Sequence, residues 1–326
     1  MRIIALTNIK GGVGKTTAAV NLAYLAAASG RRTLLWDLDP QGGATWTLRG
    51  EPAEAVSAKQ LVSGKRELPE VVNATSYEGL DLLPADFSYR HFDLHLNERK
   101  RPTERLLKMS RTLRDRYEFL FLDCPPGISL LSENVLRAAD AVVIPLIPAP
   151  LSVRMLTELS AFVEREGWDD LALLPFFSMV DRRKSLHEAV IASTRARRPA
   201  VLATEVPYSS EIERMSERRA PLPAYAPKSA AARIYVELYE EILARMGEAT
   251  APEAALSWTS AAPAEIATES ARPADRAPVA AAPPPQVSAP EPAPARVAQP
   301  IPPSWPAPPA AVEWRIRPGP EPIKAR

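Results

Sequence analysis

The 326-residue chain is uneven in composition, because 19 of its 35 prolines lie between Pro252 and Pro322. Residues 1–247 are therefore expected to fold as one domain, and residues 248–326 to form an Ala- and Pro-rich disordered tail. The 40 Lys and Arg residues nearly balance the 39 Asp and Glu residues, which excludes a strongly basic nucleic-acid coat protein and an acidic tail protein. A single cysteine, Cys124, excludes a disulfide framework and any site built from several thiolates of one chain.

Short apolar runs alternate with helical stretches through the first 247 residues. The runs lack polar alternation, which predicts parallel strands covered on both faces. The expected strands are 3–6, 33–36, 119–122, 141–147 and 171–180, with a strand pair near 71–83. The expected helices are 15–29, 103–115, 128–138, 151–166, 185–197 and 228–246, with two short ones within 50–100. This order predicts an α/β fold with a mostly parallel central sheet and helices on both faces.

A glycine-rich loop directly follows the first expected strand. It reads Lys10-Gly11-Gly12-Val13-Gly14-Lys15-Thr16-Thr17. Backbone N–H groups of such a loop, and the amino end of the helix after it, bind phosphate oxygens. We expect Lys15 to contact the β- and γ-phosphates and the Thr16 hydroxyl to bind Mg²⁺. The ordinary pattern requires glycine at position 9, where this chain has Ile9.

Acidic residues end two of the expected strands. Asp37 and Asp39 follow the second strand, and Asp123 follows the apolar run 119–122. A carboxylate at the end of such an apolar run is typical of a Walker B strand, so we expect Asp123 to hold the Mg²⁺ shell through water and Asp37 to support the metal and the loop. Cys124 is interpreted as a small buried residue of the turn.

The form K-G-G-x-G-K-T-T resembles the deviant Walker A box of the ParA/MinD family of P-loop ATPases. The resemblance implies ATP and Mg²⁺ as cofactors. It also implies an ATP-sandwich homodimer, in which Lys10 contacts the nucleotide held by the other subunit. Asp39 lies in a segment that matches the family's D-x-D-P-Q-G, and there it would position or activate the attacking water. The catalytic set is then Lys10, Lys15 and Asp39, and Gly11 to Thr17 bind the nucleotide.

Weaker similarities continue in order to about residue 246. Ser178-Met179-Val180-Asp181 resembles the family's T-M-x-D element, and Val206-Pro207 resembles its I-P stretch. On this resemblance Met179 and Pro207 flank the adenine. Two departures are Gly43, where the family often has Asn, and Tyr208, where it often has Arg. The change at Tyr208 puts simple transfer of the base contacts in doubt.

Late in the chain, basic residues gather in a candidate surface for nonspecific DNA binding. These residues are Arg195, Arg197, Arg198, Arg214, Arg218, Arg219, Lys228 and Arg233. The same side chains also fit ordinary solvated groups near helix ends, diluted by Glu211, Glu213 and Glu217.

The resemblance favours one function over several others within the family. One cysteine argues against a cluster-binding relative, and the prolines near the end argue against a membrane-binding amphipathic helix. We expect a cytoplasmic, nucleoid-associated ATPase that dimerises on ATP, binds DNA nonspecifically and uses slow hydrolysis to segregate plasmid or chromosome DNA, with a ParB-like or cargo-adaptor protein stimulating it. The alternatives are an ATPase that positions a non-DNA cargo, such as a chemoreceptor array or an envelope-synthesis complex, and a MinD-like regulator that cycles on membranes.

Overall fold

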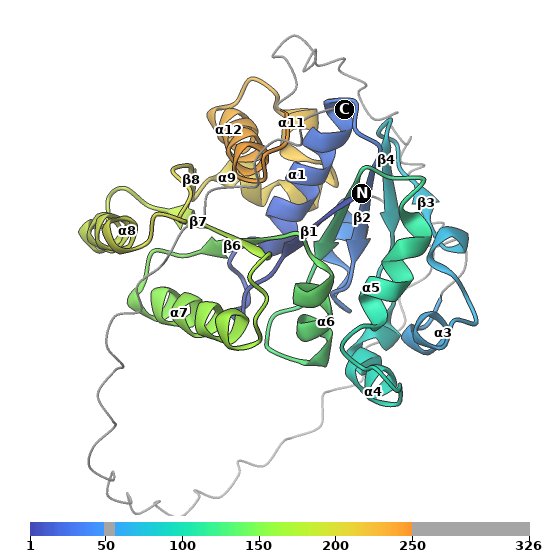
Figure 1. Ribbon diagram of the computed structural model, residues 1–326. Coiled ribbons are helices and arrows are strands. Elements are labelled where there is room, and N and C mark those ends of the chain that lie inside the picture. Colours follow the sequence, from blue (N-terminus) through green and yellow to red (C-terminus); the bar gives the residue numbers. More distant parts are fainter. Residues whose placement is uncertain (49–55, 250–326) are drawn as a thin grey trace, which may run out of the picture. The chain divides into compact units, whose positions relative to one another are not determined.

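A computed structural model describes residues 1–48 and 56–249 (Figure 1). Within them lies one eight-stranded sheet with the order β3-β4-β2-β5-β1-β6-β7-β8. All neighbouring strands are parallel except β3 and β4. The predicted mostly parallel α/β fold is thereby confirmed. The predicted tail beyond residue 249 lies outside the described residues.

The five predicted single strands and the predicted strand pair are all present. The strands are β1 Arg2–Leu6, β2 Thr33–Asp37, β3 Asn73–Ala74, β4 Leu80–Leu83, β5 Phe119–Asp123, β6 Ala141–Leu146, β7 Ala172–Val180 and β8 Glu205–Pro207. Only β8 was not predicted, since its three residues make too short a run to recognise. Its pairing with β7 includes a register irregularity between Phe177 and Val180.

Helices follow most strands and cover both faces of the sheet. The α-helices are α1 Lys15–Ala28, α2 Gly43–Thr47, α3 Ala58–Ser63, α4 Phe92–Asn97, α5 Arg105–Ser110, α6 Leu130–Ala138, α7 Pro150–Arg165, α8 Ser185–Arg197, α9 Ser210–Glu213, α10 Met215–Arg218, α11 Leu222–Tyr225 and α12 Ala230–Arg245. Three 3₁₀ turns, η1 Leu68–Glu70, η2 Phe87–His91 and η3 Arg111–Leu113, complete the described elements.

The strands alternate their side chains between two cores, one on each face. Ile4 and Leu6 of β1 pack with α1 and α12, whereas Ile3 and Ala5 pack in the core that α3 to α7 cover. Every residue of β2, β5 and β6 is buried. This explains why the strands read as unbroken apolar runs in the sequence.

Two expectations about helices differ from the structure. The helix expected over 103–115 is a six-residue α-helix, α5, followed by the 3₁₀ turn η3. The hydroxyls of Ser110 and Thr112 donate to the carbonyls of Leu107 and Met109, three residues earlier, which competes with regular helical bonding. The short helices α2, α9, α10 and α11 were not predicted either, because none is long enough to show a helical period.

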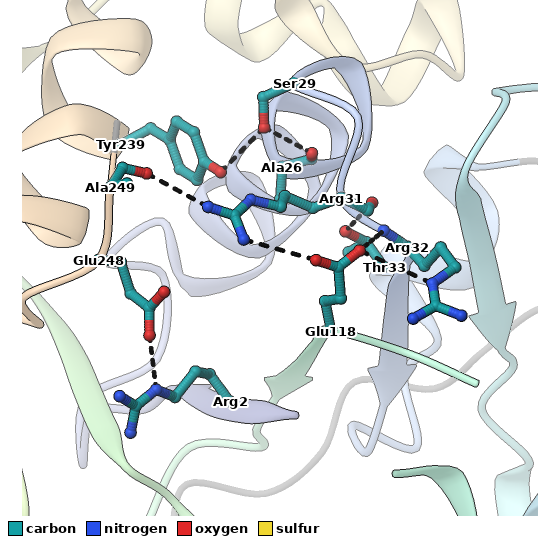
Figure 2. A network of polar contacts seen from close by, with 10 residues as sticks. All are labelled: Arg2, Ala26, Ser29, Arg31, Arg32, Thr33, Glu118, Tyr239, Glu248 and Ala249. Atoms are coloured by element: carbon teal, nitrogen blue, oxygen red, sulfur yellow. Dashed lines mark hydrogen bonds and ion pairs between the residues drawn. The ribbon is translucent and has the colours of Figure 1, made fainter. Parts of the chain in front are cut away.

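The amino ends of the strands are held by a polar network (Figure 2). The Arg2 guanidinium donates to Glu248, with 2.6 Å between Nε and Oε1, and Arg31 donates to Glu118 and to the carbonyl of Ala249. Residues 248 and 249, which the sequence assigns to the tail, therefore contact the folded domain. The network lies at the amino ends of β1, β2 and β5, so the opposite edge of the sheet is the one that remains for a ligand.

Candidate nucleotide-binding site

The phosphate loop, Asp37 and Asp123 lie at the carboxyl ends of three neighbouring strands. The central part of the sheet runs β2-β5-β1, so Asp123 of β5 pairs in register with Leu6 of β1 and with Asp37 of β2. The glycine-rich loop begins just after β1 and ends in α1. Motif residues that are far apart in the sequence therefore lie together at the carboxyl ends of the strands, where open α/β sheets bind ligands.

The loop takes its path from glycines and from one asparagine. Gly12 and Gly14 have φ angles of 68° and 91°, a region that other residues rarely adopt. The Asn8 side chain donates to the carbonyl of Pro145 and accepts the N–H of Lys10, with 2.6 and 3.0 Å between the respective atoms. Asn8 therefore fixes the start of the loop against the carboxyl end of β6.

Lys15 points its ammonium back into the loop. Its side chain is buried, and Nζ lies 3.4 Å from the carbonyl oxygen of Lys10. Burial lowers the pKa of Lys15, while Asp123, Cys124 and Asp39 oppose that shift in this order. Among the described residues, the one hydrogen-bond partner of Lys15 is this carbonyl, so the buried ammonium has hydrogen-bonding capacity that an anion could use. Lys10 by contrast is exposed at the surface.

The Asp123 carboxylate is fully buried, and its two oxygens have no hydrogen-bond donor in acceptable geometry among the described residues. The Thr16 hydroxyl still lies close enough to favour the charged form of Asp123. Burial raises the pKa of Asp123 well above its usual value, and Asp37 adds to the rise. A buried carboxylate without donors is costly in a protein alone and becomes favourable beside a cation.

Asp37 is equally buried, but both of its carboxylate oxygens accept hydrogen bonds. Its Oδ2 accepts the backbone N–H and the hydroxyl of Thr45, each at 2.8 Å, and its Oδ1 accepts the N–H of Asp39 at 3.2 Å. Burial raises its pKa to about 6 in spite of these donors. These bonds hold the turn that carries Asp39, whose own Oδ1 accepts the N–H of Gln41. Asp39 itself is half-buried at the mouth of the site.

The described residues fit a magnesium ion held partly by phosphate. They contain no group of three or more His, Cys, Asp or Glu side chains placed to bind a metal by themselves. Mg²⁺ in nucleotide sites usually takes one or two protein oxygens in addition to phosphate oxygens and water. Thr16 and Asp123 supply such a hydroxyl and a carboxylate. Gly43, the departure from the family pattern, lies against this threonine, because a Cβ atom there would be 3.1 Å from Cγ2 of Thr16.

Met179 and Pro207 come together beside the phosphate loop. They line a small cleft with Gly14 and Thr17 of the loop and with Tyr208. Met179 has a φ of 55°, which is unusual for a residue other than glycine, and such strain is typical of binding sites. Tyr208 is exposed, and its hydroxyl donates to Glu213 at 2.6 Å.

Comparison with known proteins gives consistent results. Residues 1–166 match the family model described as an AAA domain. The sporulation initiation inhibitor protein Soj of Bacillus subtilis is 32% identical over 249 residues, which are 74% of this chain and 98% of Soj. The chromosome partitioning protein ParA of Caulobacter vibrioides is 32% identical over 253 residues, 75% of this chain and 95% of that protein. The chain belongs to the ParA/MinD family, as a ParA-type member.

Solved structures agree with this assignment. Cobyrinic acid a,c-diamide synthase from Mycobacterium smegmatis, with bound ADP and magnesium, has a TM-score of 0.64 and 27% sequence identity, and the match covers 77% of this chain and 97% of that one. The ParA-type domain thus has a relative that binds both nucleotide and metal. The predicted burial of Cys124 is also confirmed, since its side chain is 2% exposed.

The late-chain basic residues of this ParA-type domain are spread over several elements. Three are engaged inside the fold. Arg195 pairs with Glu205 at 2.6 Å and donates to two backbone carbonyls. Arg198 donates to the hydroxyl of Thr157. Arg219 lies 4.2 Å above the ring of Trp46 and donates to the backbone carbonyl of that residue. The exposed members are Arg197, Arg214, Arg218, Lys228 and Arg233. Their role in DNA binding stays a prediction.

Several residues of the site carry no motif and were missed from the sequence. Asn8 shapes the loop, Thr45 holds Asp37, and the buried Asn21 of α1 accepts the N–H of Leu222 at 2.8 Å, which links the phosphate helix to α11. A buried Asn in an otherwise apolar helix is the signal that could have identified Asn21. As for membranes, none of the described helices combines the length and the apolar character needed to span a bilayer.

Proposed function

We propose that this ParA-type protein is a Mg²⁺-dependent ATPase that forms a homodimer on ATP, binds DNA nonspecifically and segregates plasmid or chromosome DNA. The observation that carries the proposal is the buried Asp123 carboxylate, whose oxygens accept no hydrogen bond in acceptable geometry from the described residues, beside the buried ammonium of Lys15 and the phosphate loop. A cation and an anion that the protein leaves without strong partners are what Mg²⁺ and a phosphate chain would satisfy together.

The residues have separate tasks in hydrolysis. The loop N–H groups and Lys15 hold the phosphates, and Thr16 and Asp123 hold the metal, which when bound offsets the charge on the phosphate oxygens. Asp39 lies at the mouth of the site on a turn fixed by Asp37, so its free movement is limited. That position suits a group that orients the attacking water. Because the part of the site that the structure describes offers carboxylates and no strong base, we expect slow turnover.

The distribution of exposed apolar side chains supports a homodimer across this edge. Seven large apolar side chains are more than half exposed among the described residues. Six of them lie in the loops or first helical turns after β2, β4, β5, β6, β7 and β8, namely Trp46, Phe87, Ile128, Leu151, Leu186 and Tyr208. Because all six follow the carboxyl ends of strands, they lie on the same side of the sheet as the phosphate loop, where a second copy could cover them. A second copy placed there would face the nucleotide, where the exposed Lys10 could contact it.

The choice of cargo rests on the relatives. Two proteins that this chain matches over nearly their whole lengths are a chromosome partitioning protein and a Soj protein. The first of these names supports DNA segregation over a non-DNA cargo. The partner that stimulates hydrolysis would be a ParB-like protein or a cargo adaptor.

The proposal is tested by measuring ATP turnover and ATP-dependent sedimentation of the wild type and three variants. Lys15→Ala should lose ATP binding, Asp39→Ala should bind ATP and remain a dimer without turnover, and Lys10→Ala should bind ATP as a monomer. Lys59→Ala, which removes another exposed lysine on α3, is the matched control and should behave as the wild type. Normal turnover in Asp39→Ala, or an ATP dimer in Lys10→Ala, would refute the respective role.

A further inference from the structure

The strongest local excess of positive charge in the described chain lies away from the late-chain arginines. Residues 99–116 contain eight Lys and Arg against two Asp and Glu, a net charge of +6. The remainder of the first 247 residues contains 25 basic and 29 acidic residues. The slight basicity of the domain therefore comes entirely from this one segment, which runs from the end of α4 through α5 to the start of β5.

Six of these eight cations line a groove of about 460 Å³, which we call the α5 groove. Its lining consists of Arg99, Lys100, Arg101, Glu104, Arg105, Leu107, Lys108 and Arg111. Arg105, Lys108 and Arg111 follow one another at three-residue steps, and the buried Leu106 and Met109 anchor the other side of α5. The helix thus presents its cations as a row on one side of the groove.

The cations of the α5 groove are incompletely satisfied by the protein. The Nε atoms of Arg99 and Arg105 are buried and have no hydrogen-bond partner among the described residues. Partial burial lowers the pKa of Arg105, and the nearby charge of Arg99 lowers it further. The two guanidinium groups therefore repel each other inside the fold. Such an arrangement costs free energy that a bound anion would recover.

The acidic residue in the lining cannot neutralise the groove. Glu104 is paired with Arg101 at 3.3 Å and with Arg137 of α6 at 3.1 Å. Its charge is thus shared by two arginines, one of them from outside the groove lining. Lys100, Lys108 and Arg111 are exposed and face solvent with no acidic lining residue besides Glu104.

We propose that the α5 groove binds the phosphate backbone of duplex DNA. The ligand must carry several anionic groups at successive positions, because the cations are arranged as a row along α5 and the turn before it. Arginine forms paired hydrogen bonds to phosphate oxygens, and the groove contains four arginines and two lysines. An amphipathic membrane-binding surface would place apolar side chains among the cations, and the only apolar side chain in the lining is the half-buried Leu107.

This proposal rests on the proposed function, which includes DNA binding. It assigns DNA binding to a surface other than the one formed by the late-chain arginines. In Figure 1, α5 lies on the right of the domain and α8 on the far left. The order of the sheet agrees, since α5 precedes the central β5, whereas α8 connects β7 and β8 at one edge. A change at one surface therefore leaves the other intact.

The test uses the full chain with ATP and a fluorescent duplex of arbitrary sequence, titrated at several salt concentrations. Lys108→Glu with Arg111→Glu should weaken binding at least tenfold and reduce the slope of log K against log salt by about 2, since each phosphate contact contributes about 0.9. The matched control, Lys59→Glu with Arg165→Glu, makes the same change in net charge at exposed sites outside the groove and should bind within twofold of the wild type. ATP turnover and ATP-dependent dimerisation should be unchanged in both.

Three results would overturn the proposal. If the groove variant binds duplex as the wild type does while Arg214→Glu with Arg218→Glu loses binding, DNA binding stands and the groove is not its site. If the groove variant loses binding only to vesicles rich in anionic lipid, the surface is a membrane site. If the wild type binds no duplex in any nucleotide state, while turnover and dimerisation persist, the DNA part of the proposed function fails together with the groove.

Discussion

Two buried aspartates lie side by side in this sheet and differ in their environment. Asp37 of β2 and Asp123 of β5 are paired in register, and neither side chain is exposed. Asp37 accepts three hydrogen bonds from Thr45 and Asp39, whereas the Asp123 oxygens have no donor in acceptable geometry among the described residues. The same residue type at the same depth thus holds a turn in one strand and remains available to a ligand in the next.

This difference shows how a carboxylate that stabilises the fold can be distinguished from one that is available to bind a ligand. Both have raised pKa values because of burial, so the pKa shift alone does not separate them. The hydrogen bonds do, because a buried group that lacks partners destabilises the free protein unless a ligand supplies them. We therefore propose that Asp123 contributes to the metal shell, and we expect Asp37 to act on the site mainly through the turn that carries Asp39.

The largest expected effect separates the two residues directly. Asp123→Asn should reduce Mg²⁺-ATP turnover by at least about 100-fold, because the proposed metal shell would lose its buried negative charge. Its ligand-free form should be at least as stable as the wild type, since a buried charge without donors is removed. Turnover is measured under saturating ATP, and the free energy of unfolding by urea titration.

Asp37→Asn is the comparison variant for this prediction. Its amide would place an N–H₂ group against one of the N–H donors that now bind Asp37, so we expect a loss of about 1–3 kcal/mol in the free energy of unfolding. Its turnover should fall much less than that of Asp123→Asn. If Asp37→Asn abolished turnover without loss of stability, the roles of the two aspartates would be reversed.

A smaller effect is expected from pH. A carboxyl whose pKa is higher in the folded than in the unfolded protein binds its proton more tightly when folded, so the fold gains stability as pH decreases. For Asp37 this gain begins near pH 6 and continues toward the unfolded value near 4, at up to about 1.4 kcal/mol per pH unit for each proton. Asp123, whose pKa is also raised, acts in the same direction.

The measurement is the unfolding midpoint of ligand-free protein between pH 7.5 and 5. We expect it to rise on acidification, and Asp123→Asn should flatten the rise because one of the two groups is gone. Saturating Mg²⁺-ATP should diminish the rise in the wild type, since a bound cation favours the charged carboxylate. A midpoint that falls steadily from pH 7.5 to 5 in the ligand-free wild type would contradict the assignment.

The sequence predicted the fold, which the structure confirms, and it also predicted where the phosphate site lies. Buried parallel strands read as apolar runs, and the loop from Lys10 to Thr17 has a spacing dictated by phosphate geometry, so both can be recognised locally. The environments of Asp37 and Asp123 could not be, because their donors, or the absence of donors, depend on residues such as Thr45 that no motif marks. The charge excess from Arg99 to Arg111 can be counted in the sequence but was not singled out there, and its arrangement as a groove depends on how α5 packs.

Thr45 gives the smallest and most specific test of the comparison. Its hydroxyl donates to Asp37 and accepts the N–H of Ala85, both at 2.8 Å, and so joins β2 to the segment after β4. Thr45→Val keeps the shape but removes both bonds, and we expect a loss of about 1–2 kcal/mol in the free energy of unfolding and a further rise in the pKa of Asp37.

Thr45→Ser retains the hydroxyl and is the matched control. Because Asp123 is untouched, turnover should fall only a fewfold. Equal stability and equal pH dependence in the Val and Ser variants would mean that the hydroxyl does not hold Asp37, and the contrast between the two aspartates would lose its physical cause.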